Sequence, residues 1–126
     1  MQLICDSGTF SFLAEEPTEH LHLAIGVPDH ETVHGFHRAA LAAGGRDNGG
    51  RGGERVDTHS GYYVAFALDP DFNTIEAVHH ESSTPDTGVI DHLWIRVRDL
   101  DATKRFYTAI APAVGTQPAN ARAGCS

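Results

Sequence analysis

Apolar and polar positions alternate with a period of two in two short segments, residues 22–27 and 92–97. The apolar positions are Leu23, Ile25 and Val27 in the first segment and Leu93, Ile95 and Val97 in the second. Successive side chains of a strand point to opposite faces of its sheet. Both segments are therefore predicted to be strands with one buried face.

Each of these strands leads into a helical pattern. Asp29 and Asp99 stand at the N-cap position, where a carboxylate accepts the free amide hydrogens of the first turn. Apolar residues then recur at helical spacing, as Val33, Phe36, Ala40 and Leu41 in the first segment and as Ala102, Phe106 and Ile110 in the second. We expect the helices to end at glycines 44–45 and within residues 112–115.

The two strand–helix segments are related copies. At a constant offset of 70 residues, from His22 to His92, five of eight residues in 22–29 and 92–99 are identical. A phenylalanine, an alanine and a glycine match at the same offset further on. An internal repeat of this kind indicates two units with the same local structure.

The remaining segments of the chain are predicted to form strands and the connections between them. Residues 61–68 and 74–78 have the composition of strands, and 69–73 that of a turn. The glycine-rich segment 44–53 lacks the lysine of a phosphate-binding loop and follows a helix, so we predict a connecting loop there. Near the start, residues 1–5 and 10–13 are predicted strands joined by a turn at 6–8.

The second unit ends before it is complete. No strand pair like that of residues 61–78 follows its helix, whereas the chain opens with a strand pair that no helix precedes. Joining the C-terminus to the N-terminus repairs both differences, because residues 124–126 then continue into 1–6 as one strand. We therefore predict a circularly permuted order. A fragment cut across two tandem domains is the alternative.

In this order the chain reads strand–helix–three strands twice. It resembles the paired βαβββ modules of the vicinal oxygen chelate superfamily, which includes glyoxalases, bleomycin-resistance proteins and extradiol dioxygenases. The most specific stretches are residues 20–27, 61–78 and 90–93.

The resemblance implies an α+β fold for residues 1–126 as a single domain. Two βαβββ modules, circularly permuted, would form a curved mixed sheet of glyoxalase-like half-barrels. One complete module is expected over residues 20–80, and the permuted module over 88–126 together with 1–16.

Strand alternation also predicts which side chains share the concave face of the sheet. The bulkier set Tyr62, Val64, Phe66 and Leu68 is expected under the helices, and the concave face is expected to carry Ser11, His22, Ala24, Tyr63, Glu76, His92, Trp94 and Arg96. Two imidazoles and one carboxylate suit a divalent transition metal and leave coordination positions open. His22, His92 and Glu76 are therefore the predicted ligands of a divalent metal ion, either Fe, Mn, Ni or Zn.

The resemblance implies what such a site does. Its metal would act as a Lewis acid on vicinal oxygens of a small-molecule substrate. Glu76 and Tyr63 are the predicted catalytic residues, with His59 considered beside Tyr63 for acid–base roles. The residues predicted to contact substrate are Ser11, Tyr63, Trp94 and Arg96.

Two functions fit this resemblance. Ser11 stands where many relatives carry a second glutamate, which argues against four-ligand glyoxalase chemistry and leaves a metal-dependent lyase or dioxygenase. The alternative is a metal-free protein that binds or sequesters small molecules, as bleomycin-resistance proteins do.

Composition argues against some classes of binding partner. The net charge of −8, without a Lys/Arg cluster, argues against a nucleic acid or an anionic membrane as partner. The chain has no apolar run of membrane-spanning length and no secretory signal pattern, so we expect a cytoplasmic protein. Cys5 and Cys125 are accordingly expected as reduced thiols, with a disulfide as the alternative.

The predicted break inside a strand also bears on association. Each terminus would leave a half-strand, and exchange of such strands between chains is a simple route to a two-fold dimer. We therefore predict a homodimer with residues 1–6 or 115–126 at its interface.

Overall fold

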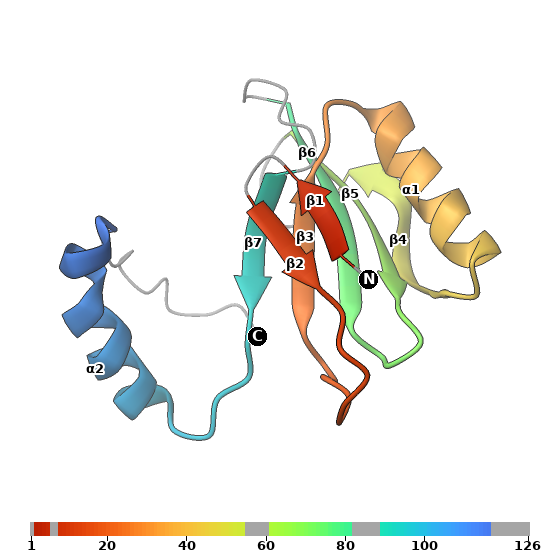
Figure 1. Ribbon diagram of the computed structural model, residues 1–126. Coiled ribbons are helices and arrows are strands. Elements are labelled where there is room, and N and C mark those ends of the chain that lie inside the picture. The colour runs from red at the N-terminus through yellow and green to blue at the C-terminus, as the bar shows by residue number, and fades with distance from the viewer. Residues whose placement is uncertain (1, 6–7, 55–60, 82–88, 117–126) are drawn as a thin grey trace. The chain divides into compact units, whose positions relative to one another are not determined.

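The computed structural model describes residues 2–5, 8–54, 61–81 and 89–116. The fold is α+β, with a mixed five-stranded sheet (Figure 1). The chain divides into two compact units, Met1–Ile95 and Arg96–Ser126. The elements in chain order are β1 (Gln2–Cys5), β2 (Gly8–Ser11), β3 (His22–Gly26), α1 (His30–Ala42), β4 (Arg46–Glu54), β5 (Tyr62–Leu68), β6 (Thr74–His80), β7 (Val89–Trp94), α2 (Leu100–Ile110) and a 3-10 turn (Ala111–Val114).

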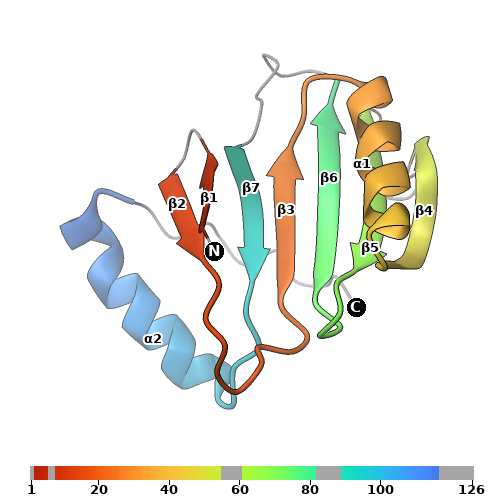
Figure 2. The same ribbon diagram turned by 45° about the vertical axis from the view of Figure 1, so that its right-hand side comes forward.

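The five-stranded sheet has the order β4-β5-β6-β3-β7 (Figure 2). β3 runs parallel to β6 and antiparallel to β7, and β5 is antiparallel to both of its neighbours. Between His22 and His80 the chain thus follows the order strand, helix and three strands. This order places β3 and β6 in the centre, with β7 beside β3.

Helix α1 covers one face of this sheet, over β5 and β6 (Figure 2). It begins as predicted at Asp29, whose carboxylate accepts hydrogen bonds from the Thr32 amide and hydroxyl at 2.7 and 2.6 Å. These bonds hold the pKa of Asp29 below its usual value, since they favour the charged carboxylate. Gly44, with φ of 95°, follows the last turn in the left-handed conformation that glycine adopts readily.

The faces of β5 are the reverse of those predicted. Phe66 is paired with Glu76 and Val64 with Val78, so the bulkier set shares the face of Glu76. The prediction that Tyr63 shares that face is wrong, because its hydroxyl lies 2.7 Å from His34 Nε2 on α1. The reason is steric. Alanines of β5 and β6 face the helix and let it pack closely, whereas the larger residues fill the opposite face.

That opposite face has its own apolar cluster. Ala24, Val64, Phe66 and Val78 are buried together, and Tyr62 packs against them. Its residues come from β3, β5 and β6, and β3 and β6 also carry two of the candidate ligands described below. On the helix side, Val33 of α1 is fully buried, as its helical spacing predicts.

The prediction of a connecting loop over residues 44–53 is also wrong. Arg46–Glu54 forms β4, an edge strand paired with β5. Its register shifts between Asp47 and Arg51 and again between Arg51 and Gly53. Strand pairing uses backbone groups, so a segment with no apolar alternation can still complete a sheet edge. Gly49 has φ of 81°, in keeping with glycine at the irregular stretch.

Asn73 connects the β5–β6 turn to the start of β3. Its Oδ1 accepts from the Leu21 amide at 2.9 Å, and its Nδ2 donates to the Thr18 carbonyl at 2.7 Å. A further bond runs from Nδ2 to Asp69 Oδ2 at 3.0 Å. The side chain is 7% exposed, so it replaces water for backbone groups that lead directly into His22.

The predicted opening hairpin is present with shifted bounds. β1 and β2 pair antiparallel, from Gln2 opposite Ser11 to Cys5 opposite Gly8. The predicted join from Ser126 to Met1 lies outside the described residues. In the second unit, Asp99 caps α2 as expected, its carboxylate accepting from the Ala102 amide at 2.9 Å. No helix in the described part of the chain is long and apolar enough to cross a membrane.

Candidate metal centre

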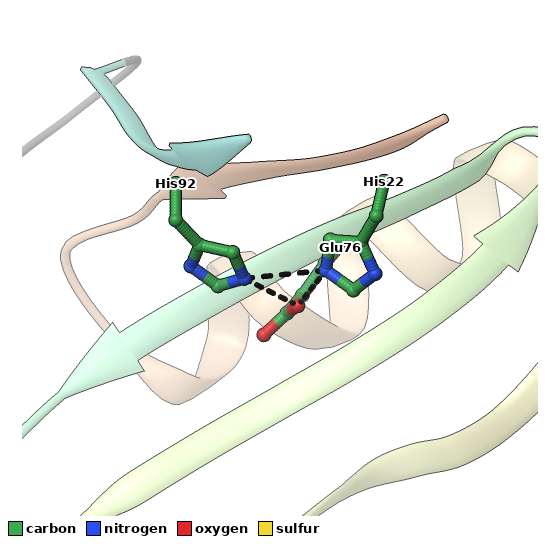
Figure 3. A group of neighbouring side chains, drawn as sticks. All are labelled: His22, Glu76 and His92. Atoms are coloured by element: carbon green, nitrogen blue, oxygen red, sulfur yellow. Dashed lines mark hydrogen bonds and ion pairs between the residues drawn. The ribbon is translucent and has the colours of Figure 1, made fainter. Parts of the chain in front are cut away.

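Three adjacent strands bring His22, Glu76 and His92 together (Figure 3). His22 opens β3, Glu76 lies in the middle of β6 and His92 in β7. Ala24 is the register partner of both Glu76 and His92, so all three side chains project on the face opposite α1. The convergence follows from the alternation within each strand and from the order β6-β3-β7.

The contacts between these side chains are short. His22 Nε2 lies 2.7 Å from Glu76 Oε2, and His92 Nε2 lies 3.4 Å from the same oxygen. The two Nε2 atoms are 3.2 Å apart. Two imidazole nitrogens and one carboxylate oxygen thus point at a common position, as Figure 3 shows.

The donor set fits a divalent transition metal. Ligand atoms at 2.0–2.2 Å from a zinc-class ion, at tetrahedral or octahedral angles, lie about 2.9–3.6 Å from one another. The observed separations of 2.7, 3.2 and 3.4 Å need only small side-chain adjustments to reach that range. Mixed imidazole and carboxylate ligands favour Zn, Fe, Ni or Mn over Ca or Mg.

The buried carboxylate of Glu76 needs hydrogen-bonding partners within the protein. The residue is 2% exposed, and a carboxylate without water is costly unless it is paired. His22 supplies that pairing, with its Nε2 at 2.7 Å from Oε2. The Tyr62 hydroxyl donates to Oε1 at 3.4 Å.

A second carboxylate orients His92. Asp91 Oδ2 lies 2.8 Å from His92 Nδ1, and Asp91 Oδ1 lies 2.8 Å from His80 Nε2. Burial raises the pKa of Asp91, but the hydrogen bonds with the two histidines outweigh it and the pKa lies below the usual value. A carboxylate at Asp91 requires the proton of a neutral His92 to reside on Nδ1. The lone pair of Nε2 is then directed toward Glu76 and His22, the tautomer that a metal ligand needs.

Aromatic rings surround His22. The Trp94 ring stacks on it with centroids 4.6 Å apart, and the His92 ring stacks at 5.1 Å. The edge of Phe66 approaches the imidazole at 6.2 Å. Trp94 is 59% exposed, so an apolar surface open to solvent lies directly beside the candidate ligands.

The other predicted site residues have different positions. Tyr63 lies on the α1 face, so its predicted catalytic and substrate-contacting roles at this site are corrected. Ser11 belongs to the β1–β2 hairpin and Arg96 begins the second unit, and their contact with substrate stays a prediction. His59 lies outside the part of the chain that the structure describes.

Sequence reasoning missed Tyr62 and Asp91. Tyr62 is an even-numbered residue of β5, and the turn at 69–73 pairs even-numbered residues of β5 with even-numbered residues of β6. That register was available as a signal once the turn was assigned. Asp91 precedes a candidate ligand, and its role depends on a side-chain orientation that no pattern reveals.

No known family model and no curated protein matches this sequence. The chemistry of the site therefore has to be argued from its own residues.

Proposed function

We propose that this chain is a metal-dependent small-molecule enzyme of the vicinal oxygen chelate type. His22, His92 and Glu76 hold a divalent metal, which acts as a Lewis acid on two neighbouring oxygens of the substrate. The observation that carries the proposal is the convergence of His22 Nε2, His92 Nε2 and Glu76 Oε2 within 3.4 Å of one another. The βαβββ order of β3 to β6 and the matched positions of the two histidines support the same class.

The proposal also includes the larger architecture of this class of protein. The curved half-barrel sheet, the circular permutation and the completion of the second module by β1 and β2 are part of the proposal. Three protein ligands leave room for two substrate oxygens, which favours a dioxygenase or lyase that chelates its substrate.

Side chains around the ligands suggest how substrate is bound. Trp94 offers an exposed ring for stacking against an apolar or aromatic substrate. Tyr62 and Asp91 position Glu76 and His92. Glu76 either remains a ligand or accepts a proton, and its burial keeps water away from the carboxylate.

Metal content tests the ligand assignment. The protein purified without chelators, or loaded with Zn²⁺, is compared with the double variant His22→Ala/Glu76→Ala by elemental analysis. We expect the double variant to lose one equivalent of metal per chain. His37→Ala is the matched control, because His37 pairs with Asp47 at 3.1 Å away from this site. Unchanged metal content in the double variant would refute the assignment.

A second experiment separates the enzyme from the metal-free alternative. The alternative gains support from the contacts themselves, because His22 and Glu76 satisfy one another at 2.7 Å without an ion. Protein loaded with Co²⁺ is titrated with catechol, which presents two vicinal oxygens. Chelation at the metal changes the visible spectrum of cobalt, whereas equal binding of catechol after metal removal indicates a metal-free binding protein.

A further inference from the structure

The end of β6 lies at the same end of the sheet as the start of α1 (Figure 2). A second cluster of side chains that could hold a metal ion comes from these segments. His30 is the first residue of α1, His79 lies in β6 and Glu81 follows that strand. One ligand atom from each of the three lies within 4.8 Å of the others.

This cluster is separate from the first. His79 is paired with Tyr63, which contacts α1, whereas Glu76 projects from β6 on the opposite face. Alternation along β6 thus supplies one ligand to each face of the sheet. The proposed enzymatic site uses none of these three residues.

Each histidine of the cluster is held in place by another group. His79 Nδ1 lies 3.2 Å from the Val27 carbonyl, which can only accept, so Nδ1 carries the proton and the Nε2 lone pair is left for a ligand. The His30 ring stacks on Tyr63 with centroids 3.7 Å apart and an angle of 9°. Tyr63 is fixed in turn by its contact with His34. Such outer contacts orient histidines for metal binding.

Glu81 is held through its backbone. Its amide donates to the Gly61 carbonyl at 2.8 Å. Gly61 has φ of 95°, and a Cβ there would lie 2.9 Å from Glu81 Cβ, so glycine permits this close approach. The Glu81 carboxylate then reaches His30 Nε2 at 2.5 Å.

The exposure and chemistry of the cluster suit an ion from solution. The side chains of His30 and Glu81 are 47% and 51% exposed, and an exposed pair of this kind adds little stability by itself. Two imidazoles and a carboxylate bind zinc-class ions well, and open positions are available to water.

We propose that His30, His79 and Glu81 form a second divalent metal site, which binds a zinc-class ion and ties the start of α1 to the end of β6. The ion joins segments about fifty residues apart in the chain, from His30 to Glu81. Because the unfolded chain does not hold these residues together, the ion stabilises the folded protein by RT ln(1 + c/Kd), where c is the concentration of free Zn²⁺.

Zinc titration with the first site removed tests this proposal. In the His22→Ala/Glu76→Ala background we expect one equivalent of Zn²⁺ per chain and a higher melting temperature with zinc. Adding His79→Ala removes both effects. Adding Glu81→Gln weakens zinc binding at least about 100-fold, since even outer groups of a metal site are worth 10–100-fold. Adding His37→Ala leaves zinc binding unchanged, because His37 does not belong to the cluster and pairs with the Asp47 carboxylate.

The same zinc titration is also carried out on the wild-type protein and on the single variant His79→Ala, in case the His22→Ala/Glu76→Ala protein folds poorly. Wild-type protein should bind two equivalents, and His79→Ala should bind one. If the first site binds no metal, wild-type protein binds one equivalent and His79→Ala none, so the two proposals fail separately. If His79→Ala binds as much zinc as the wild-type protein and its circular dichroism spectrum is unchanged, the proposal of a second site is wrong.

Discussion

Glu76 is surrounded by side chains that replace the water lost by its carboxylate. His22 and His92 approach Oε2, and Tyr62 donates to Oε1. Removing His22 or Tyr62 leaves a buried acceptor less satisfied, which costs more than an exposed contact. The candidate site thus also depends on Tyr62, which does not belong to the ligand group.

The two adjacent tyrosines of β5 provide a matched test at this scale. Tyr62→Phe removes the hydroxyl that donates to Glu76 at 3.4 Å. At about 1 kcal/mol for this hydrogen bond, metal affinity of the first site should fall about fivefold. Tyr63→Phe should leave that affinity unchanged, because its hydroxyl faces His34. Competition with a chelator in the His79→Ala background measures both. A larger effect from Tyr63→Phe would contradict the assignment of faces.

Asp91 gives a second prediction at the residue scale. Asp91→Ala removes the acceptor of His92 Nδ1, so the ring is free to turn and to exchange tautomers. Metal affinity of the first site should fall 10–100-fold, as for other outer carboxylates of histidine ligands. Asp91→Asn is the control, since an amide oxygen can still accept from Nδ1 and should preserve most of the affinity. Equal affinity in wild type and Asp91→Ala would show that this contact does not orient the ligand.

At the scale of elements, the first site depends on how β3 meets the β5–β6 hairpin. Asn73 makes that connection through the Leu21 amide and the Thr18 carbonyl, and the Thr74 amide donates to the Leu21 carbonyl at 2.8 Å. The start of β3 and the candidate ligand His22 are therefore positioned by a turn that lies about fifty residues later in the sequence.

Asn73→Ala tests this connection. The substitution removes the side-chain hydrogen bonds to the Leu21 amide, the Thr18 carbonyl and Asp69 Oδ2, so the free energy of unfolding should fall by about 1–3 kcal/mol. Asn48→Ala is the matched control, because Asn48 is exposed and its Nδ2 donates to the Thr74 hydroxyl at 3.2 Å, so its effect should stay within about 0.5 kcal/mol. Urea denaturation measures both. Similar losses in the two variants would argue against a special role for Asn73.

At the scale of the whole molecule, association is the open prediction. β7 lies at the end of the strand order in the described five-stranded sheet, and the edge of a sheet is where a further strand can be added. Large apolar residues of β7 are exposed in the single chain, including Leu93 at 51% and Trp94 at 59%. Both features are consistent with a partner for this edge, either from the same chain or from a second copy.

We predict a homodimer with residues 1–6 or 115–126 at its interface. Light scattering at micromolar concentration should give twice the chain mass of 13.6 kDa. A chain shortened by residues 117–126 is the comparison, and loss of the dimer in it would assign the interface to the C-terminal segment. A single species of 13.6 kDa in the full chain would end the dimer prediction.

Sequence by itself determined many of the local elements and grouped the three residues that the fold brings together at the first site. Some features depend only on neighbouring residues in the chain, so a pattern can predict them. They are the caps at Asp29 and Asp99, the end of α1 just before Gly44 and the turn before Thr74. His22, His92 and Glu76 could be grouped because two are repeat positions and all three are in phase on their own strands.

Tertiary structure decided what depends on pairing between distant segments. Glycine-rich residues 46–54 became a strand because β5 offered backbone partners, which no side-chain pattern records. The face of Tyr62 and Tyr63 followed from the register of β5 with β6 and from the close packing of α1 on alanines. The cluster of His30, His79 and Glu81 required the start of a helix to meet the end of a strand about fifty residues later. Such contacts depend on how segments pack and on the register in which strands pair. The pattern of residues along the chain contains no information on either.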